Sequence, residues 1–346
     1  MCQGPMHEFL KALPKCEHHM HLEGSLEPSL LFSLASLNKI PLPTTDTAFT
    51  SPETLLRRYR AFTSLDDFLH YYFIGMSVLI TSSDFEALAT AYFERAHADG
   101  VLHAEVFFDP QAHTSRGVRY EDVVDGFRAA QEKARQKWGL TSELIVCVLR
   151  HLPVEDGMAM YRAAIPDLEA GRVKGLGLSS TELGNPPGKY KAIFDDAVAR
   201  GFNRTAHAGE EAGVEYMASA LHDLHVTRVD HGIKLTQDPA VLKEFVDAKI
   251  LITMCPLSNV ELRCIPSIAD LPIRKYLDEG VRFSINSDDP AYFGGYILDN
   301  YCAVQDTFGL EKKEWEVVVR NSIEGSWCAE ERKREILKVL EEVMGR

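Results

Sequence analysis

Eight short apolar runs, most of them followed by a stretch with helical spacing, restrict the fold of this 346-residue sequence more than any other feature. Strands that alternate with helices predict a parallel sheet, because each helix returns the chain to the same edge. Eight such units favour a (β/α)8 barrel over an open, doubly wound sheet, and the sequence lacks the glycine-rich dinucleotide fingerprint. The expected strands are 16–21, 102–108, 143–149, 173–178, 204–207, 228–230, 250–254 and 281–286.

The chain is longer than such a barrel needs. A typical (β/α)8 barrel uses about 250 residues, so roughly 100 are surplus here. We expect residues 1–346 to form one domain, with a helical insertion at about 28–100 and further helices at about 300–346. An insertion after the first strand lies over the C-terminal mouth, where barrel enzymes carry their active sites. We therefore predict a lid, and an extra helical layer without a gating role is the alternative.

Composition excludes several classes of function. The formal net charge is −14, whereas nucleic acids and anionic membranes are bound by basic faces, so neither is an expected partner. No apolar run approaches the length of about 18 residues that a membrane helix needs. The N-terminus lacks the basic-then-apolar layout of a secretory signal. We expect a cytoplasmic protein, with the nucleus as a second location, that acts on a small molecule.

The first predicted strand carries an unusual set of polar residues. Side chains at alternate positions of a strand share a face, so Glu17, His19, His21 and Glu23 are predicted to point the same way. Two imidazoles one pleat apart can bind a single metal ion, and histidine is a common zinc ligand. Taken alone, the pattern also fits a polar strand with hydrogen-bonded histidines.

Three later motifs place further polar residues at the ends of predicted strands. His207 is followed three residues later by Glu210, His231 precedes a glycine, and Asp288 and Asp289 follow the last strand. The C-terminal ends of all the strands meet at one mouth of a barrel. Two adjacent carboxylates repel unless a cation neutralises one of them, although Asp-Asp-Pro by itself also fits a turn. Together the four motifs predict a metal-dependent active site.

These motifs, at residues 19–21, 205–210, 230–232 and 287–290, resemble the adenosine/adenine deaminase branch of the amidohydrolase superfamily. The resemblance runs from about residue 13 to 310 and implies a (β/α)8 barrel with one catalytic zinc ion. It also implies that Glu210 shuttles protons, that His231 lies beside the metal-bound water and that Asp289 contacts purine N7. The positions that match the metal ligands are His19, His21, His207 and Asp288.

Other residues favour the free base over the nucleoside. Residues 21–24, His-Leu-Glu-Gly, look like the fungal and bacterial adenine deaminases, whereas adenosine deaminases usually carry Asp at the position of Glu23. The longer carboxylate is expected to crowd the space that ribose needs. Ser179 departs from the Asp expected in that subfamily, and Ser180 is a predicted contact to the base edge. Aromatic residues of the insertion that are expected to help close the pocket are Phe62, Phe68 and Tyr72.

The resemblance implies the zinc-dependent hydrolysis of adenine to hypoxanthine and ammonia, with adenine and water as partners. Adenosine or a 6-substituted purine nucleotide is the alternative substrate. An alternative of another class is a purine-binding protein that has lost catalysis, but every expected ligand position and Glu210 hold competent residues. The motifs of cytidine deaminases and of zincin proteases are absent.

Overall fold

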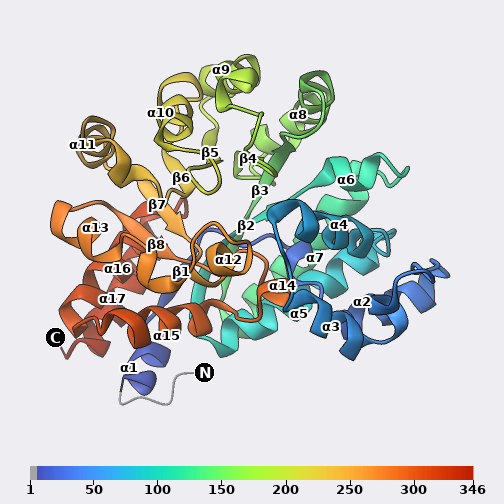
Figure 1. Cartoon of the computed structure of the whole chain (residues 1–346), viewed down its shortest axis with the longest axis horizontal. Coiled ribbons are helices and arrows are strands. Elements are labelled where there is room, and N and C mark those ends of the chain that lie inside the picture. Colours follow the sequence, from blue (N-terminus) through green and yellow to red (C-terminus); the bar gives the residue numbers. More distant parts are fainter. Residues whose placement is uncertain (1–5, 346) are drawn as a thin grey trace.

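The computed structural model describes residues 6–345, and all eight predicted strands occur in it. They form one parallel sheet in the order of the sequence, with helices on its outside (Figure 1). The prediction of a (β/α)8 barrel is confirmed. The strands are β1 Lys15–Glu17, β2 Val101–Phe108, β3 Thr141–Leu149, β4 Gly175–Ser179, β5 Asn203–Ala208, β6 Arg228–His231, β7 Leu251–Met254 and β8 Phe283–Ile285.

The first strand is shorter than predicted. Its regular pairing ends at Glu17, and the next residues bond to neighbours on both sides. The Phe107 N–H donates to Met20 O on the β2 side at 2.9 Å, and the His21 N–H donates to Asp288 O beyond β8, also at 2.9 Å. Isolated backbone hydrogen bonds of this kind connect the residues after β1 with those after β8. The segment that carries the histidines therefore closes the barrel.

The helices form where apolar residues recur at helical spacing. In α7, Tyr120–Trp138, the buried residues Val123, Phe127 and Ala130 share one face, and Gly139 ends the helix with φ of 66°. The other helices are α1 His7–Ala12, α2 Pro28–Asn38, α3 Pro52–Tyr59, α4 Leu65–Met76, α5 Ser82–Ala98, α6 Pro110–Thr114, α8 Val154–Glu169, α9 Lys191–Ala199, α10 Val214–Asp223, α11 Pro239–Asp247, α12 Pro256–Glu261, α13 Ile273–Glu279, α14 Pro290–Phe293, α15 Ile297–Phe308, α16 Lys312–Gly325 and α17 Glu330–Val343. In the described part of the chain, none is long and apolar enough to cross a membrane.

The predicted insertion is helical and contains α2, α3, α4 and α5 between β1 and β2. Aromatic side chains join it to α14, which follows β8. The rings of Tyr59 and Tyr292 stack with centroids 4.4 Å apart, and the rings of Phe68 and Phe293 lie 4.8 Å apart. The insertion therefore packs against the segment that begins directly after Asp288 and Asp289. Its opening and closing as a lid stays a prediction.

Candidate active site

The C-terminal ends of β1, β5, β6 and β8 bring five buried ligand candidates together. Nε2 of His19 lies 3.2 Å from Oδ1 of Asp288, and Nε2 of His21 lies 3.5 Å from the same oxygen. Nε2 of His21 and Nε2 of His207 are 3.1 Å apart. His231 joins the cluster, since ligand atoms of His19, His207, His231 and Asp288 all lie within 4.8 Å of one another. The four residues predicted as metal ligands thus meet at one point.

The chemistry of this cluster fits a metal ion. Two of the three histidines have a group at the other ring nitrogen: Nδ1 of His19 bonds Thr253 Oγ1 at 3.0 Å, and Nδ1 of His207 faces Asp230 at 3.2 Å, whereas Nδ1 of His21 has no hydrogen-bond partner among the described residues. Such partners orient an imidazole and leave Nε2 for a metal. Nε2 of His19 is buried and has no hydrogen-bond partner among the described residues. A cation among these nitrogens and the Asp288 carboxylate satisfies all of them.

Three of the seven non-glycine residues with left-handed φ in the described part of the chain lie at the same place. His231, Asp288 and Ser180 have φ of 63°, 65° and 77°, in the left-handed region that residues other than glycine rarely adopt. Each such residue costs about 1–3 kcal/mol, which the surrounding structure must offset. All three residues line one cavity, so the strain lies where the polar side chains converge.

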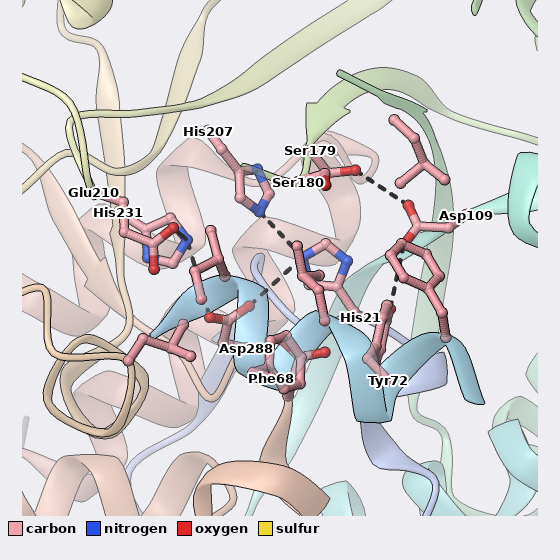
Figure 2. Close-up of a pocket in the computed structure, with 16 residues that line it drawn as sticks. His21, Phe68, Tyr72, Asp109, Ser179, Ser180, His207, Glu210, His231 and Asp288 are labelled. Atoms are coloured by element: carbon pink, nitrogen blue, oxygen red, sulfur yellow. Dashed lines mark hydrogen bonds and ion pairs between the residues drawn. The ribbon is translucent and has the colours of Figure 1, made fainter. Parts of the chain in front are cut away.

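A cavity opens beside the cluster (Figure 2). Helix α4 of the insertion supplies one wall, which is mostly apolar, and the strand ends supply the polar groups. This combination of an apolar wall with a few converging polar groups is typical of a small-molecule site. The lining residues are His21, Leu65, Phe68, Leu69, Tyr72, Phe73, Asp109, Leu149, Ser179, Ser180, His207, Glu210, His231, Leu262, Asp288 and Asp289.

Glu210 and His231 form a pair at one side of the cavity. Nδ2 of Asn259 bonds Nδ1 of His231 at 3.1 Å, which leaves Nε2 for another partner. That nitrogen is 3.4 Å from Oε2 of Glu210. Burial, followed by the negative charge of Asp288, raises the pKa of Glu210 well above its usual value, while burial lowers the pKa of His231. The pair therefore holds an acid and a neutral imidazole next to the cluster.

A family model described as adenosine deaminase matches residues 14–343. The chain belongs to the adenosine deaminase family. An adenine deaminase of Aspergillus oryzae is 54% identical over 344 residues, which cover 99% of this chain and 97% of that protein. An adenine deaminase of Schizosaccharomyces pombe is 52% identical over 97% of this chain and 92% of its own. The crystal structure of an adenine deaminase from Arthrobacter aurescens has a TM-score of 0.91 at 39% identity and covers 96% of this chain and 100% of that one.

Of the predicted substrate contacts in this family member, two line the cavity. Asp289 does so with Oδ1 unpartnered among the described residues, and burial, then the charge of Asp288, raises its pKa well above the usual value. A Cβ atom on Gly24 would lie 2.0 Å from Asp289 Oδ1, so only glycine fits there. Ser180 also lines the cavity, and its Oγ bonds Nδ1 of His151 at 2.7 Å.

Glu23 lies behind the lining rather than in it. It is fully buried, and its Oε1 accepts from the backbone N–H of Asp109 at 3.0 Å and from Nε2 of His113 at 2.9 Å. The expected face-sharing with His21 does not apply, because the strand has ended and Glu23 begins a 3-10 turn, Glu23–Ser25. The Glu23 carboxyl group is therefore joined to the cavity wall through Asp109.

Asp109 is a lining residue with a carboxyl group that the sequence analysis missed. It follows β2 directly, as Asp289 closely follows β8, and each precedes a proline. Their backbone angles nearly coincide, with φ and ψ of −114° and 74° for Asp109 and of −116° and 74° for Asp289. The repeated Asp-Pro after a strand was the available signal. Of the three predicted pocket aromatics, Phe68 and Tyr72 line the cavity, and Phe62 is buried behind it.

Proposed function

We propose that this chain hydrolyses adenine to hypoxanthine and ammonia and uses one zinc ion. The observation that carries the proposal is the meeting of the histidine–aspartate cluster with Glu210 and His231 at one cavity. The fungal relatives named adenine deaminase, which align over nearly the whole chain, support the choice of substrate. The residues proposed to hold the metal are His19, His21, His207 and Asp288.

When bound, zinc supplies acidity, because it lowers the pKa of a water molecule to about 7. The residues of the chain do the rest. His231 and Asp288 orient the attacking oxygen toward C6 of the purine. Glu210, held as an acid by burial, gives a proton to N1 while the oxygen of water bonds to C6. One water proton restores Glu210 and the other passes to N6, so the C6–N6 bond breaks, ammonia leaves and the oxygen stays on C6 as the 6-oxo group. Asp289 binds N7, where a neutral carboxyl group can donate its proton.

The first experiment compares ammonia release from adenine, adenosine and 6-substituted purines by metal-replete protein, with a chelator control. We expect release from adenine, its loss with chelator and its return with zinc. Release mainly from adenosine or a nucleotide would assign the alternative substrate. No release at all would favour a purine-binding protein without catalysis.

The second experiment uses Glu210→Gln, which keeps the size of the side chain. General acid catalysis typically contributes about 10²–10⁴ in rate, so kcat should fall by that factor. The zinc content, measured by elemental analysis, should stay near one per chain. A variant that retains wild-type kcat would remove Glu210 from the mechanism, and wild-type protein without stoichiometric zinc would remove the metal.

We further propose that residues 1–346 act as one domain, that the helical insertion at about 28–100 serves as the lid, and that small molecules are the partners, with no nucleic acid and no membrane. The net charge of −14 supports the last point. The cytoplasm is the proposed location, with the nucleus as the second.

A further inference from the structure

Asp109 is a buried carboxyl group on the cavity wall that the proposed mechanism does not use. Oδ1 accepts from Ser179 Oγ and Oδ2 accepts from Tyr72 Oη, each at 3.2 Å. Its side chain is almost fully shielded from solvent. Figure 2 shows Asp109 with Ser179 and Tyr72 on the opposite side of the cavity from Glu210 and His231. A polar group held this firmly in a cavity wall is placed to bind a ligand.

The edges of a purine determine what this group can meet. The mechanism above, on which this inference rests, directs N1 to Glu210, N7 to Asp289 and C6 to the metal cluster. The polar edge that remains is N3 with N9, on the far side of the ring from C6. In the free base this edge offers one acceptor, N3, and one donor, N9–H, separated by one carbon atom. A neutral carboxyl group offers the complementary pair, an O–H donor and a carbonyl acceptor, at the same spacing.

We propose that Asp109 is a specificity-determining residue that binds the N3/N9–H edge of a free purine base and thereby excludes N9-substituted purines. Burial, followed by the charge of Glu23, raises the pKa of Asp109 well above its usual value, which favours the neutral acid that this pairing needs. Ser179 and Tyr72 hold the plane of the carboxyl group. The Ser at position 179 is thus a donor to Asp109.

A nucleoside has no hydrogen on N9, so it leaves the buried Asp109 without a partner and also presses the sugar against it. Sites built to bond a substrate N–H reject analogues without it by up to about 10⁴–10⁵. Glu23 is then a positioning residue: its Oε1 holds the Asp109 N–H at 3.0 Å and fixes the strand end from which the carboxyl group projects. The preference for the base comes from Asp109, and Glu23 acts through it.

The test compares kcat/KM for adenine and for 9-methyladenine, which keeps C6, N1 and N7 but has no N9–H. In Asp109→Ala we expect kcat/KM for adenine to fall about 100-fold or more, while the low value for 9-methyladenine changes less than about fivefold. Asp109→Asn carries a carbonyl oxygen and an NH₂ group in place of the acid, so it should retain adenine activity within about tenfold. Asp84→Asn is the matched control, because Asp84 is a buried aspartate outside the cavity, and it should leave the ratio unchanged.

If Asp109→Ala lowered kcat/KM equally for adenine and 9-methyladenine, so that the ratio of the two values stayed unchanged, the inference would be overturned. Wild-type protein that releases no ammonia from adenine would instead overturn the proposed function. A binding measurement separates the two: by calorimetry, wild-type protein should prefer hypoxanthine over 9-methylhypoxanthine, and Asp109→Ala should lose this preference. If Asp109→Ala does not fold, the pair Ser179→Ala and Tyr72→Phe, which frees the carboxyl group, should lower the adenine to 9-methyladenine ratio severalfold. No change in that ratio would count against Asp109.

Discussion

Glu182 holds the loop that carries Glu210. Replacing Glu182 should therefore displace Glu210, the proposed acid, although Glu210 itself is unchanged. The Glu182 carboxylate accepts three backbone N–H groups of the segment after β5: from Glu210 at 3.3 Å, from Glu211 at 3.2 Å and from Ala212 at 2.7 Å. Glu182 is fully buried, and burial raises the pKa of its carboxyl group, while the charge of buried Arg150 and the backbone N–H groups oppose this shift.

The cost of Glu182→Ala follows from these contacts. Each buried N–H left without an acceptor costs about 1–3 kcal/mol. The N–H groups of Glu210 and Ala212 are buried, so their loss costs about 2–6 kcal/mol of unfolding free energy, and the part-buried N–H of Glu211 adds less because water can reach it. Total stabilities of domains are about 5–15 kcal/mol, so the variant should fold at low temperature. A displacement of a catalytic group by about 1 Å can cost 100-fold in rate, so kcat should fall by about that factor.

The assay pairs urea unfolding with steady-state kinetics on adenine and a zinc determination. Glu182→Gln, which keeps one acceptor oxygen, should lose less stability than Glu182→Ala. Glu169→Ala is the control, because this exposed residue pairs only with Arg200 at the surface and should cost under about 1 kcal/mol. If Glu182→Ala lost stability but kept wild-type kcat and zinc, the loop would be held by other contacts, and the reasoning would be refuted.

Two other substitutions test the packing beside Asp289 and the buried lysine at the start of β1. Gly24→Ala would place a Cβ 2.7 Å from the Cα of Asp289, a backbone clash that no rotamer relieves. We therefore expect kcat/KM for adenine to fall at least about tenfold. Unchanged kinetics would show that the loop shifts freely to make room for the methyl group. Lys15 is buried with Nζ 2.7 Å from Leu10 O, and burial lowers its pKa to about 7. Because unfolded lysine keeps its proton to about pH 10.4, wild-type stability should rise by about 2 kcal/mol from pH 7 to 9 relative to Lys15→Met; parallel pH profiles in urea unfolding would contradict this.

The barrel could be predicted because its signal is repeated. Each of the eight apolar runs is weak, but their alternation with helical stretches leaves few folds. The end of the first strand was less predictable, because the pairing of Met20 and His21 is set by Phe107 and Asp288, which lie far away in the sequence. The rule that alternate side chains share a face holds only while a strand continues. The strand ends before Glu23, so Glu23 does not share the face predicted for it.

The candidate site was predictable where its residues follow strands and belong to known motifs. His19, His207 and Asp288 meet because parallel strands end at one mouth. The Asp-Pro pair after the second strand marked Asp109 only weakly, since such a pair after a strand is also an ordinary turn. Tyr72 reaches the Asp109 carboxyl group because α4 packs over the mouth of the barrel, and this packing makes Asp109 part of the cavity wall.

The same local feature, a residue followed by proline after a strand, fixes the backbone conformation of three residues at the mouth of the barrel. After β2, β7 and β8 a proline opens a short helix: Pro110 begins α6, Pro256 begins α12 and Pro290 begins α14. A residue before proline is excluded from the helical region, and proline at the first helical position needs no N–H partner. Asp109, Cys255 and Asp289 therefore share φ between −114° and −124° and ψ between 74° and 80°. Each strand thus ends with its last side chain in a fixed direction, and two of these three side chains are the carboxyl groups proposed to bind opposite edges of the base.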